Sequence, residues 1–262
     1  MALWTPAAIS TDLWLDAADA STVYDTSVGG SLTVDGGNVG RWEDKSGNAR
    51  HAIQATSGNR PVRSGTSISF QDKWLSVPTA AFALGRCVVG VLDSDATGWT
   101  SGGLLTIGST PVDNPDIRFG TVGGDAFAAY WGGGYAINQT TGYGMLTPSV
   151  HAFAIETGIK VTLWRNGTQT VTGTRAATWN PITEFTLGKF LRFAAQVGRH
   201  GTIRELVICG PSDRVINEGY LAWKWGYQGS LPNDHPYKNA APAIGSGIIP
   251  ILRQHYAAQG AR

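Results

Sequence analysis

Charge, cysteine and long apolar runs are all scarce in this chain of 262 residues. Charged residues make up only 15% of the chain, and 20 basic residues nearly balance 19 acidic ones. No block of Lys and Arg occurs, which excludes the basic surface that nucleic acid binding requires. No apolar run approaches the roughly 18 residues of a membrane span, so no membrane contact is predicted.

Only two cysteines are present, Cys87 and Cys209, and neither has the spacing of a metal-ligand or Cys-x-x-Cys motif. Each lies in an apolar, strand-like run, which favours two buried free thiols over a disulfide. The N-terminus has neither a basic region nor an apolar region, so it is not a secretory signal as it stands. The alternative is that an upstream signal was removed.

Glycine and tryptophan are abundant instead, with 35 and 10 residues, and hydrophobic residues reach 42%. This composition is typical of a turn-rich β protein with a packed core and a neutral surface, and it argues against disorder. Short strand candidates with turn residues between them follow one another from residue 12 to residue 209. The sequence therefore predicts an all-β fold, a two-sheet antiparallel jelly-roll sandwich.

One segment near the C-terminus breaks this strand pattern. Ile216, Tyr220 and Trp223 recur at i, i+4 and i+7, which is one face of an α-helix. Glycine follows at once and prolines stand a few residues further on, which ends the helix. We therefore expect one amphipathic helix over 213–225 that packs on the sandwich and closes a domain of residues 1–237.

The chain beyond residue 237 has a different composition. Residues 238–247 form a linker of small residues, and an apolar stretch follows within a tail that ends at residue 262. A tail of this kind either tucks against the sandwich or docks on a partner. The residues expected to make the attachment are Ile248, Ile249, Ile251, Leu252 and Tyr256.

Three stretches of sequence resemble a known family. The first, Ile9 to Val23, contains Asp-Leu-Trp-Leu-Asp-Ala-Ala-Asp, and the second, Val39 to Ala52, contains Trp-Glu-Asp-Lys-Ser-Gly-Asn. The third runs from Glu218 to Gly226 and is followed by Leu-Pro-Asn-Asp-His-Pro-Tyr, and the short piece Asn59-Arg-Pro61 belongs to the same pattern. Together they are similar to the concanavalin A-like, laminin-G-like jelly-roll proteins found among bacteriophage virion proteins and some bacterial surface proteins. The resemblance covers about residues 9–237.

The resemblance implies a non-enzymatic virion structural protein, a fibre, spike or decoration subunit at the virion surface that is made in the host cytoplasm. It implies contact with other virion proteins through the tail, binding to host-surface polysaccharide, and a homo-oligomer, expected to be a trimer. No cofactor is expected, but calcium stays open because laminin-G-like members of the fold often carry it. This fold hosts lectins, receptor modules, glycanases and inert scaffolds. Two alternatives therefore stay open, a bacterial surface or secreted glycan-binding module and a glycanase.

Catalytic pairs are missing from the sequence. A glycanase on this fold needs two carboxylates about 5–9.5 Å apart, and neither Glu-x-Asp-x-Glu nor Glu-x-Asp-x-x-Glu occurs. Glu43 and Asp44 are adjacent and point apart if extended, and Glu156 stands alone. The five histidines are scattered without metal-ligand spacing, and no Gly-x-Ser-x-Gly occurs. The sequence therefore predicts that the protein is not an enzyme.

Two regions rich in loops carry the candidate binding residues. Aromatic rings beside amides bind sugars, and glycine-spaced aromatics occur between residues 126 and 143. The predicted carbohydrate-binding residues are Trp99, Tyr130, Trp131, Tyr135, Asn138 and Tyr143. The alternatives are that some of these rings belong to the core or that they contact another protein. Asp113 and Asp116 are the candidate calcium ligands, with ordinary turn-forming residues as the alternative.

Overall fold

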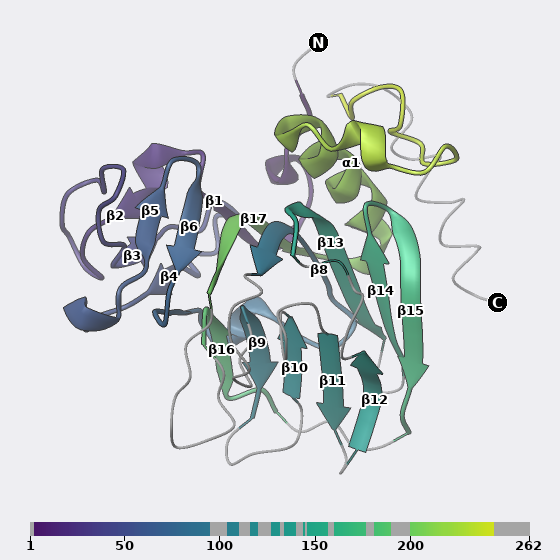
Figure 1. The fold of residues 1–262 in the computed structure, drawn as a ribbon, viewed down its shortest axis with the longest axis horizontal. Coiled ribbons are helices and arrows are strands. Elements are labelled where there is room, and N and C mark those ends of the chain that lie inside the picture. The colour runs from purple at the N-terminus through teal and green to yellow at the C-terminus, as the bar shows by residue number, and fades with distance from the viewer. Residues whose placement is uncertain are drawn as a thin grey trace.

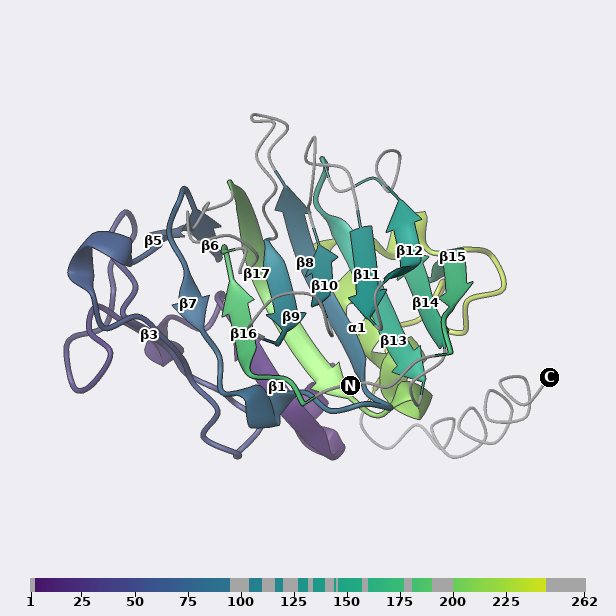
Figure 2. The same ribbon diagram turned by 90° about the horizontal axis from the view of Figure 1, so that it is seen from below.

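Two antiparallel β-sheets lie face to face in this protein, and one α-helix packs on the outer face of one of them (Figures 1 and 2). The structure is a computed structural model. It describes residues 3–94, 104–109, 116–119, 127–131, 134–139, 144, 146–156, 160–176, 181–189 and 200–243. The predicted fold class, an all-β antiparallel sandwich with one C-terminal helix packed on it, is confirmed.

The first sheet has eight strands within the described residues, in the order β15-β14-β13-β8-β17-β6-β5, with β1 beside β17. Its strands are β1 (Thr11–Asp16), β5 (Val62–Ser64), β6 (Ser67–Phe70), β8 (Cys87–Ser94), β13 (Ser149–Glu156), β14 (Lys160–Arg165), β15 (Thr168–Thr174) and β17 (Gly201–Cys209). The predicted Asn166-Gly167 turn joins β14 to β15, and both of its residues have positive φ.

The second sheet has nine strands within the same described residues, in the order β12-β11-β10-β9-β16-β7-β4-β3-β2. Its strands are β2 (Val23–Tyr24), β3 (Arg41–Trp42), β4 (Ala52–Ile53), β7 (Leu75–Ser76), β9 (Leu105–Gly108), β10 (Asp116–Phe119), β11 (Phe127–Trp131), β12 (Gly134–Gln139) and β16 (Glu184–Leu187). Figure 2 shows β16, β9, β10, β11 and β12 in front of β17, β8, β13 and β14.

Side-chain alternation along the strands places the main core between the two sheets. Phe119 of β10 packs against Phe127 at a ring-centroid distance of 4.8 Å and against Phe153 of β13 at 5.1 Å. Both sheets therefore contribute rings to one buried cluster. Most inward-facing side chains are apolar because they leave water to form this core.

A second core lies between the helix α1 (Arg214–Trp225) and the outer face of the eight-stranded sheet. Val89 and Val91 of β8 face the helix, while Val88 and Leu92 face the other sheet. This strand is thus covered on both faces from Cys87 to Leu92, which explains why that part of its sequence is continuously apolar and does not alternate.

The helix begins within one residue of the prediction and ends where it was predicted. Gly226 follows it in the left-handed conformation, with φ of 79°, and its N–H donates to the carbonyl of Ala222. The short 3-10 helices are Pro6–Ala8, Ala20–Thr22, Ser57–Asn59, Thr79–Ala81, Pro211–Asp213 and Gln228–Ser230. No helix in the described part of the chain is long and apolar enough to cross a membrane.

Cys87 and Cys209 are direct register partners on the neighbouring strands β8 and β17. Both side chains are completely buried under the helix, and both thiols are free. The adjacent thiol and the burial together hold the pKa of Cys209 well above its usual range. The prediction of two buried free thiols is confirmed, although nothing in the sequence indicated that they face one another.

The segment after the helix packs back on it. Trp223 Nε1 donates a hydrogen bond of 2.7 Å to the carbonyl of Tyr237. The ring of Tyr237 lies so close to Gly219 that a Cβ there would stand 2.5 Å from it. The N–H of Trp4 donates to the carbonyl of Pro242 at 2.9 Å, so the start of the predicted linker lies beside the N-terminal segment.

Candidate functional site

A buried network of charged groups joins the three stretches of sequence that carry the family resemblance. Asp16 comes from the first stretch, Lys45 from the second and Lys224 from the third. Lys224 Nζ lies 2.8 Å from Asp16 Oδ1, and Lys45 Nζ lies 3.1 Å from Asp16 Oδ2. The side chain of Asp16 is only 5% exposed, so these ion pairs are largely shielded from water.

Glu205 of β17 is the fully buried carboxylate of this network. Its Oε1 accepts hydrogen bonds from Trp14 Nε1 at 2.7 Å and from the hydroxyl of Tyr220 at 2.9 Å. Its Oε2 accepts one from Trp225 Nε1 at 2.8 Å and lies 2.7 Å from Lys224 Nζ. Burial raises the pKa of Glu205 and a neighbouring carboxylate adds to this effect, whereas Lys224 and Trp14 oppose it. This carboxylate holds structural elements together.

Asp44, in the second stretch, organises the loop that follows it. Its Oδ1 accepts hydrogen bonds from the backbone N–H groups of Trp14 and Ser46, both at 2.9 Å. Its Oδ2 accepts one from the N–H of Arg50 at 3.0 Å, and Asn48 Nδ2 reaches the backbone of β1 at 2.9 Å. The residues that carry the resemblance are therefore used inside the domain, as determinants of its fold.

The carboxylates considered for glycan hydrolysis belong to different sheets. Glu43 follows β3 in the nine-stranded sheet and pairs with Arg41 at 3.1 Å. Glu156 ends β13 in the eight-stranded sheet and pairs with Lys160 at 3.3 Å. Each has a cation partner of its own, and neither lines the cavities described below.

His151 lies on β13 between the two sheets and is 1% exposed. Its Nε2 is 2.8 Å from the Oγ of Ser149, and its ring packs edge-on against Phe119 at 6.1 Å. Burial lowers the pKa of His151 to about 3, and the positive charge of Arg165 adds to the effect. A Ser–His pair can serve nucleophilic catalysis, but here both side chains are enclosed in the core, so the imidazole is a neutral core group.

The predicted aromatic site lies partly within the described residues. Tyr135, which is 42% exposed, and Asn138, also exposed, lie on β12 at the edge of the nine-stranded sheet. The structure describes Tyr130 and Trp131 only as positions on β11, where Tyr130 is the register partner of Tyr135. The predicted site residues that lie outside the described residues are Trp99 and Tyr143.

The calcium ligands and the tail fall largely outside the described residues as well. Asp116 is described only as a position on β10, and Asp113 is not described. Among the described residues no group of three or more His, Cys, Asp or Glu could hold a metal ion. The tail residues outside the described part are Ile248, Ile249, Ile251, Leu252 and Tyr256. The calcium site and the attachment role both stay predictions.

A polar groove opens on the eight-stranded sheet. Two adjoining cavities that share Ser69 and Gln71 form it, and we call them the β5–β6 cavity and the β6–β17 cavity. Their volumes are about 540 Å³ and about 370 Å³. Both fall within the range of small-ligand sites, roughly 300–1,000 Å³.

The groove follows one row of outward-facing residues across four neighbouring strands. These register partners are Val62, Ser69, Thr202 and Asp93. Ile68 and Ile203, the adjacent residues in β6 and β17, point into the main core, so the row faces the opposite side. Val91, two residues before Asp93, packs under the helix. The outer face of this sheet therefore changes from apolar beneath the helix to polar beside it.

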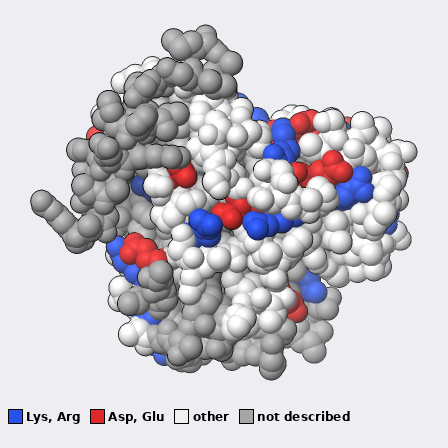
Figure 3. Space-filling view, turned by 180° about the vertical axis from the view of Figure 1, so that it is seen from behind, with Lys and Arg blue, Asp and Glu red and all other residues white. Residues whose placement is uncertain are grey.

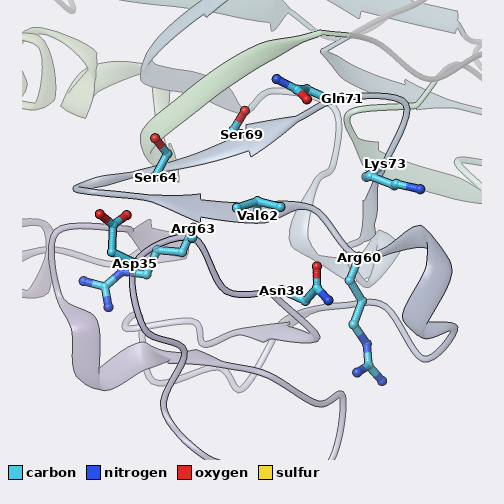
Figure 4. A pocket seen from close by; sticks show the side chains of 10 residues that line it. Asp35, Asn38, Arg60, Val62, Arg63, Ser64, Ser69, Gln71 and Lys73 are labelled. Atoms are coloured by element: carbon cyan, nitrogen blue, oxygen red, sulfur yellow. The ribbon is translucent and has the colours of Figure 1, made fainter.

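Figure 4 shows how side chains line the β5–β6 cavity. Asp35 and Arg63 lie at one end, Arg60 and Lys73 lie at the other end, and Gln71 projects from the chain just after β6 (Figure 4). The β6–β17 cavity is lined in part by Asp93, His200 and Thr202, and the hydroxyl of Thr202 donates to Asp93. The groove thus offers amides, hydroxyls and charges of both signs.

The sequence reasoning did not identify the groove as a site, although Arg60 belongs to a family-like piece of sequence. The available signal was the spacing of Arg60, Arg63 and Lys73 in a polar stretch with a single acidic residue. Figure 3 shows the opposite face of the molecule from Figure 1, where Lys, Arg, Asp and Glu lie in small mixed groups on a mainly neutral surface. That face has no extended patch of one sign in the part described, in keeping with the net charge of +1.

Comparison with known proteins identifies the fold and no more. No family profile matches the chain, and no curated protein sequence matches it. A Trypanosoma rangeli sialidase in complex with a difluoro-KDN matches with a TM-score of 0.53 and 17% identity, over 76% of this chain and 30% of that chain. Another structure of this sialidase, in complex with 2,3-difluorosialic acid, matches with a TM-score of 0.54 and 17% identity, over 80% and 32%. The protein spans roughly a third of the sialidase chains.

Replacement of Lys224 by Met tests the role of the buried network. The change leaves Asp16 and Glu205 without their shared cation, and we expect the free energy of unfolding to fall by about 3 kcal/mol. Urea denaturation measures the loss. The control is Lys160→Met at the exposed pair with Glu156, which should cost less than about 1 kcal/mol. Equal losses in the two variants would show that the network does not hold the domain together.

The buried His151 predicts a particular acid sensitivity. Its folded pKa of about 3 lies below the ordinary value of 6.5, so its contribution to stability is complete above pH 6.5. As the pH falls toward 3, His151 binds a proton in the unfolded chain but stays neutral in the folded protein. The free energy of unfolding therefore falls by up to about 1.4 kcal/mol per pH unit. Thermal unfolding across this range should show a shallower decline for His151→Gln than for wild type. If the stability of His151→Gln declined as steeply as that of the control, His200→Gln, the assignment of His151 as a neutral core group would be wrong.

Proposed function

We propose that this protein is a non-enzymatic glycan-binding β-sandwich whose ligand lies in the polar groove. The observation that carries the proposal is a set of polar side chains in the groove that form no hydrogen bond with other described residues. The side chains of Asn38, Ser64, Ser69 and Gln71 line the β5–β6 cavity and make no hydrogen bond within the described residues. Amides and hydroxyls of this kind are the groups that bind sugar hydroxyls.

The open shape of the groove supports a chain-like ligand. The two cavities adjoin along a row that crosses four strands, so a ligand can extend from β5 toward β8. A glycan of several sugar units fits such a surface, because each unit presents hydroxyl groups at regular intervals. The likeness to the sialidase structures supports the sandwich scaffold, and the groove itself is argued from this chain's residues alone.

The carboxylates at the groove support a binding role without catalysis. Each cavity has one aspartate among its described lining residues, Asp35 in the first and Asp93 in the second. Asp35 accepts a hydrogen bond of 2.6 Å from the N–H of Gly65, and Asp93 accepts one from Thr202. In most glycosidases one carboxyl group gives a proton and a second acts as base or nucleophile, although some, such as sialidases, use a tyrosine nucleophile. Structural carboxylates of this kind suit neither task.

A virion setting is the second part of the proposal. We propose that the protein is a phage virion subunit, a fibre, spike or decoration protein, in which the groove binds host-surface polysaccharide and the tail attaches to other virion proteins. The support is the resemblance of the three motif stretches. The alternative setting, a bacterial surface or secreted module, uses the same groove.

Particle composition distinguishes the two settings. We expect mass spectrometry of purified particles from the source phage to detect this chain at a fixed ratio to the other structural proteins. Particles washed at high salt provide the control for adsorbed protein. If washed particles lack the chain, the virion assignment is wrong, while the proposed glycan binding is unaffected.

A glycan array with groove variants tests the binding proposal. Wild type should bind at least one glycan class, and Ser69→Ala/Gln71→Ala should bind it about tenfold more weakly, since two hydrogen bonds of about 0.5–1.5 kcal/mol each are lost. Gln169→Ala, an exposed glutamine on the distant β15, is the matched control and should bind as wild type does.

Tyr135→Ala identifies the site in the same experiment. Binding that survives Tyr135→Ala and fails in the double variant assigns the ligand to the groove. The reverse result would assign it to the β11–β12 hairpin that the aromatic pattern predicted. An array on which wild type binds nothing would show that the protein is not a glycan-binding module.

A further inference from the structure

We infer that the groove takes an acidic glycan, one that carries carboxylate or sulfate groups, rather than a neutral one. This inference rests on the proposed function and specifies its ligand class. Three cationic side chains, Arg60, Arg63 and Lys73, line the β5–β6 cavity. In the described part of the chain none of the three has a carboxylate within ion-pair distance.

Arg60 is held in place by uncharged groups. Its Nε and both terminal nitrogens donate to the backbone carbonyls of Gln54, Asp25 and Ala55, at 3.1, 2.8 and 3.0 Å. Carbonyl oxygens orient a guanidinium group and leave its full positive charge in place. Arg60 therefore presents a charge of fixed position at one end of the cavity (Figure 4).

Arg63 and Lys73 are held in the same manner. A terminal nitrogen of Arg63 donates to the carbonyl of Thr33 at 2.7 Å, and Lys73 Nζ donates to the carbonyl of Gly58 at 2.5 Å. The Nε of Arg63 is buried and has no hydrogen-bond partner among the described residues. Arg63 is the register partner of Ile68, which points into the main core, so its side chain lies off the outward-facing row and it contributes positive charge to the cavity rather than a donor in that row.

This pattern differs from that of the structural cations in the same molecule. Lys45, Lys224 and Arg214 each lie within 3.1 Å of a carboxylate oxygen. Those pairs neutralise their charges inside the fold. Among the described residues the hydrogen-bond partners of the three cations are backbone carbonyls, so none of the cations is neutralised by a direct ion pair there, and a bound anion could form one.

The negative charges at the groove do not cancel this excess. Asp35 is the one acidic residue among the described residues that line the β5–β6 cavity, against three cations. Asp93 lies in the adjoining cavity and accepts the hydroxyl of Thr202, while His200 there lies 3.4 Å from Asp72. The β5–β6 cavity therefore carries a net positive charge, whereas Asp93 makes the described lining of the β6–β17 cavity negative.

The groove also lacks the usual means of binding a neutral sugar. No Phe, Tyr or Trp occurs among the described residues that line either cavity, and the imidazole of His200 is the one aromatic ring in that lining. The described lining therefore offers no large aromatic ring for the apolar face of a sugar, and hydrogen bonds and charge supply most of the affinity. The cationic residues can bind the acid groups of a ligand, and the amides and hydroxyls can bind its sugar hydroxyls. Together these groups match an acidic glycan.

Two matched pairs of probes test the inference. Oligogalacturonate and its methyl ester differ in carboxylate charge and in the small methyl group of each ester, and dextran sulfate and dextran differ only in sulfate groups. By calorimetry we expect at least one acidic probe to bind at least about tenfold more tightly than its neutral partner, since charge-assisted hydrogen bonds are the stronger kind. The pair that shows the difference identifies the acid group. The preference should shrink as ionic strength rises from about 0.02 to about 0.3 M.

Lys73→Gln tests whether this charge belongs to the groove. We expect the variant to bind the acidic probe about fivefold more weakly, the effect of one partly exposed ion pair. The matched control is Lys238→Gln, because Lys238 is also half-buried and also donates to carbonyls, those of Gly229 and Leu231, away from the groove. It should bind as wild type does.

Two results would overturn the inference. One is that neither acidic probe binds more tightly than its neutral partner, and the other is that Lys73→Gln weakens binding no more than Lys238→Gln. If the protein bound only neutral glycans on the array, the proposed glycan binding would stand and the acidic ligand class would be wrong. A protein that binds no glycan at all would lose the proposed function, so the two failures are distinguishable.

Discussion

Asp16 of β1 and Glu205 of β17 face each other in the register of the eight-stranded sheet, and both are buried. Two such carboxylates repel each other unless a cation lies between them, and Lys224 of the helix supplies it at 2.8 and 2.7 Å. The helix must therefore dock where Lys224 reaches both oxygens. Hydrogen bonds from Trp14, Tyr220 and Trp225 then satisfy Glu205. This ionic constraint fixes which part of the sheet the helix covers.

The position of the helix divides the outer face of that sheet into two parts. Beneath the helix, β8 and β17 present Val89, Val91 and Val207 to an apolar core. Beyond it, the same strands present Asp93 and Thr202 to the polar groove. The groove therefore lies on the part of the sheet that the helix does not cover. A glycan-binding role and a preference for acid groups both rest on this uncovered, polar part of an otherwise ordinary sandwich.

The fold could be predicted in most respects because its signals are local. Alternation in β14, the Asn166-Gly167 turn and the helical spacing of Ile216, Tyr220 and Trp223 all lie within short stretches of sequence. The site could not be predicted in the same manner. The criterion was the presence of exposed Tyr and Trp side chains, which indicated residues 126–143, whereas the described lining of the groove contains no Phe, Tyr or Trp. The motif residues that suggested a family proved to be fold determinants.

By itself the sequence determined the two sheets, the single helix, the buried thiols and the set of charges available to the molecule. Only the tertiary structure decided which of those charges are neutralised. Lys45 and Lys224 meet carboxylates from distant parts of the chain, whereas Arg60 and Lys73 meet only backbone carbonyls. The reason is physical. Alternation and turn preferences act between near neighbours in sequence, but the field at a charged group depends on whatever folding brings beside it.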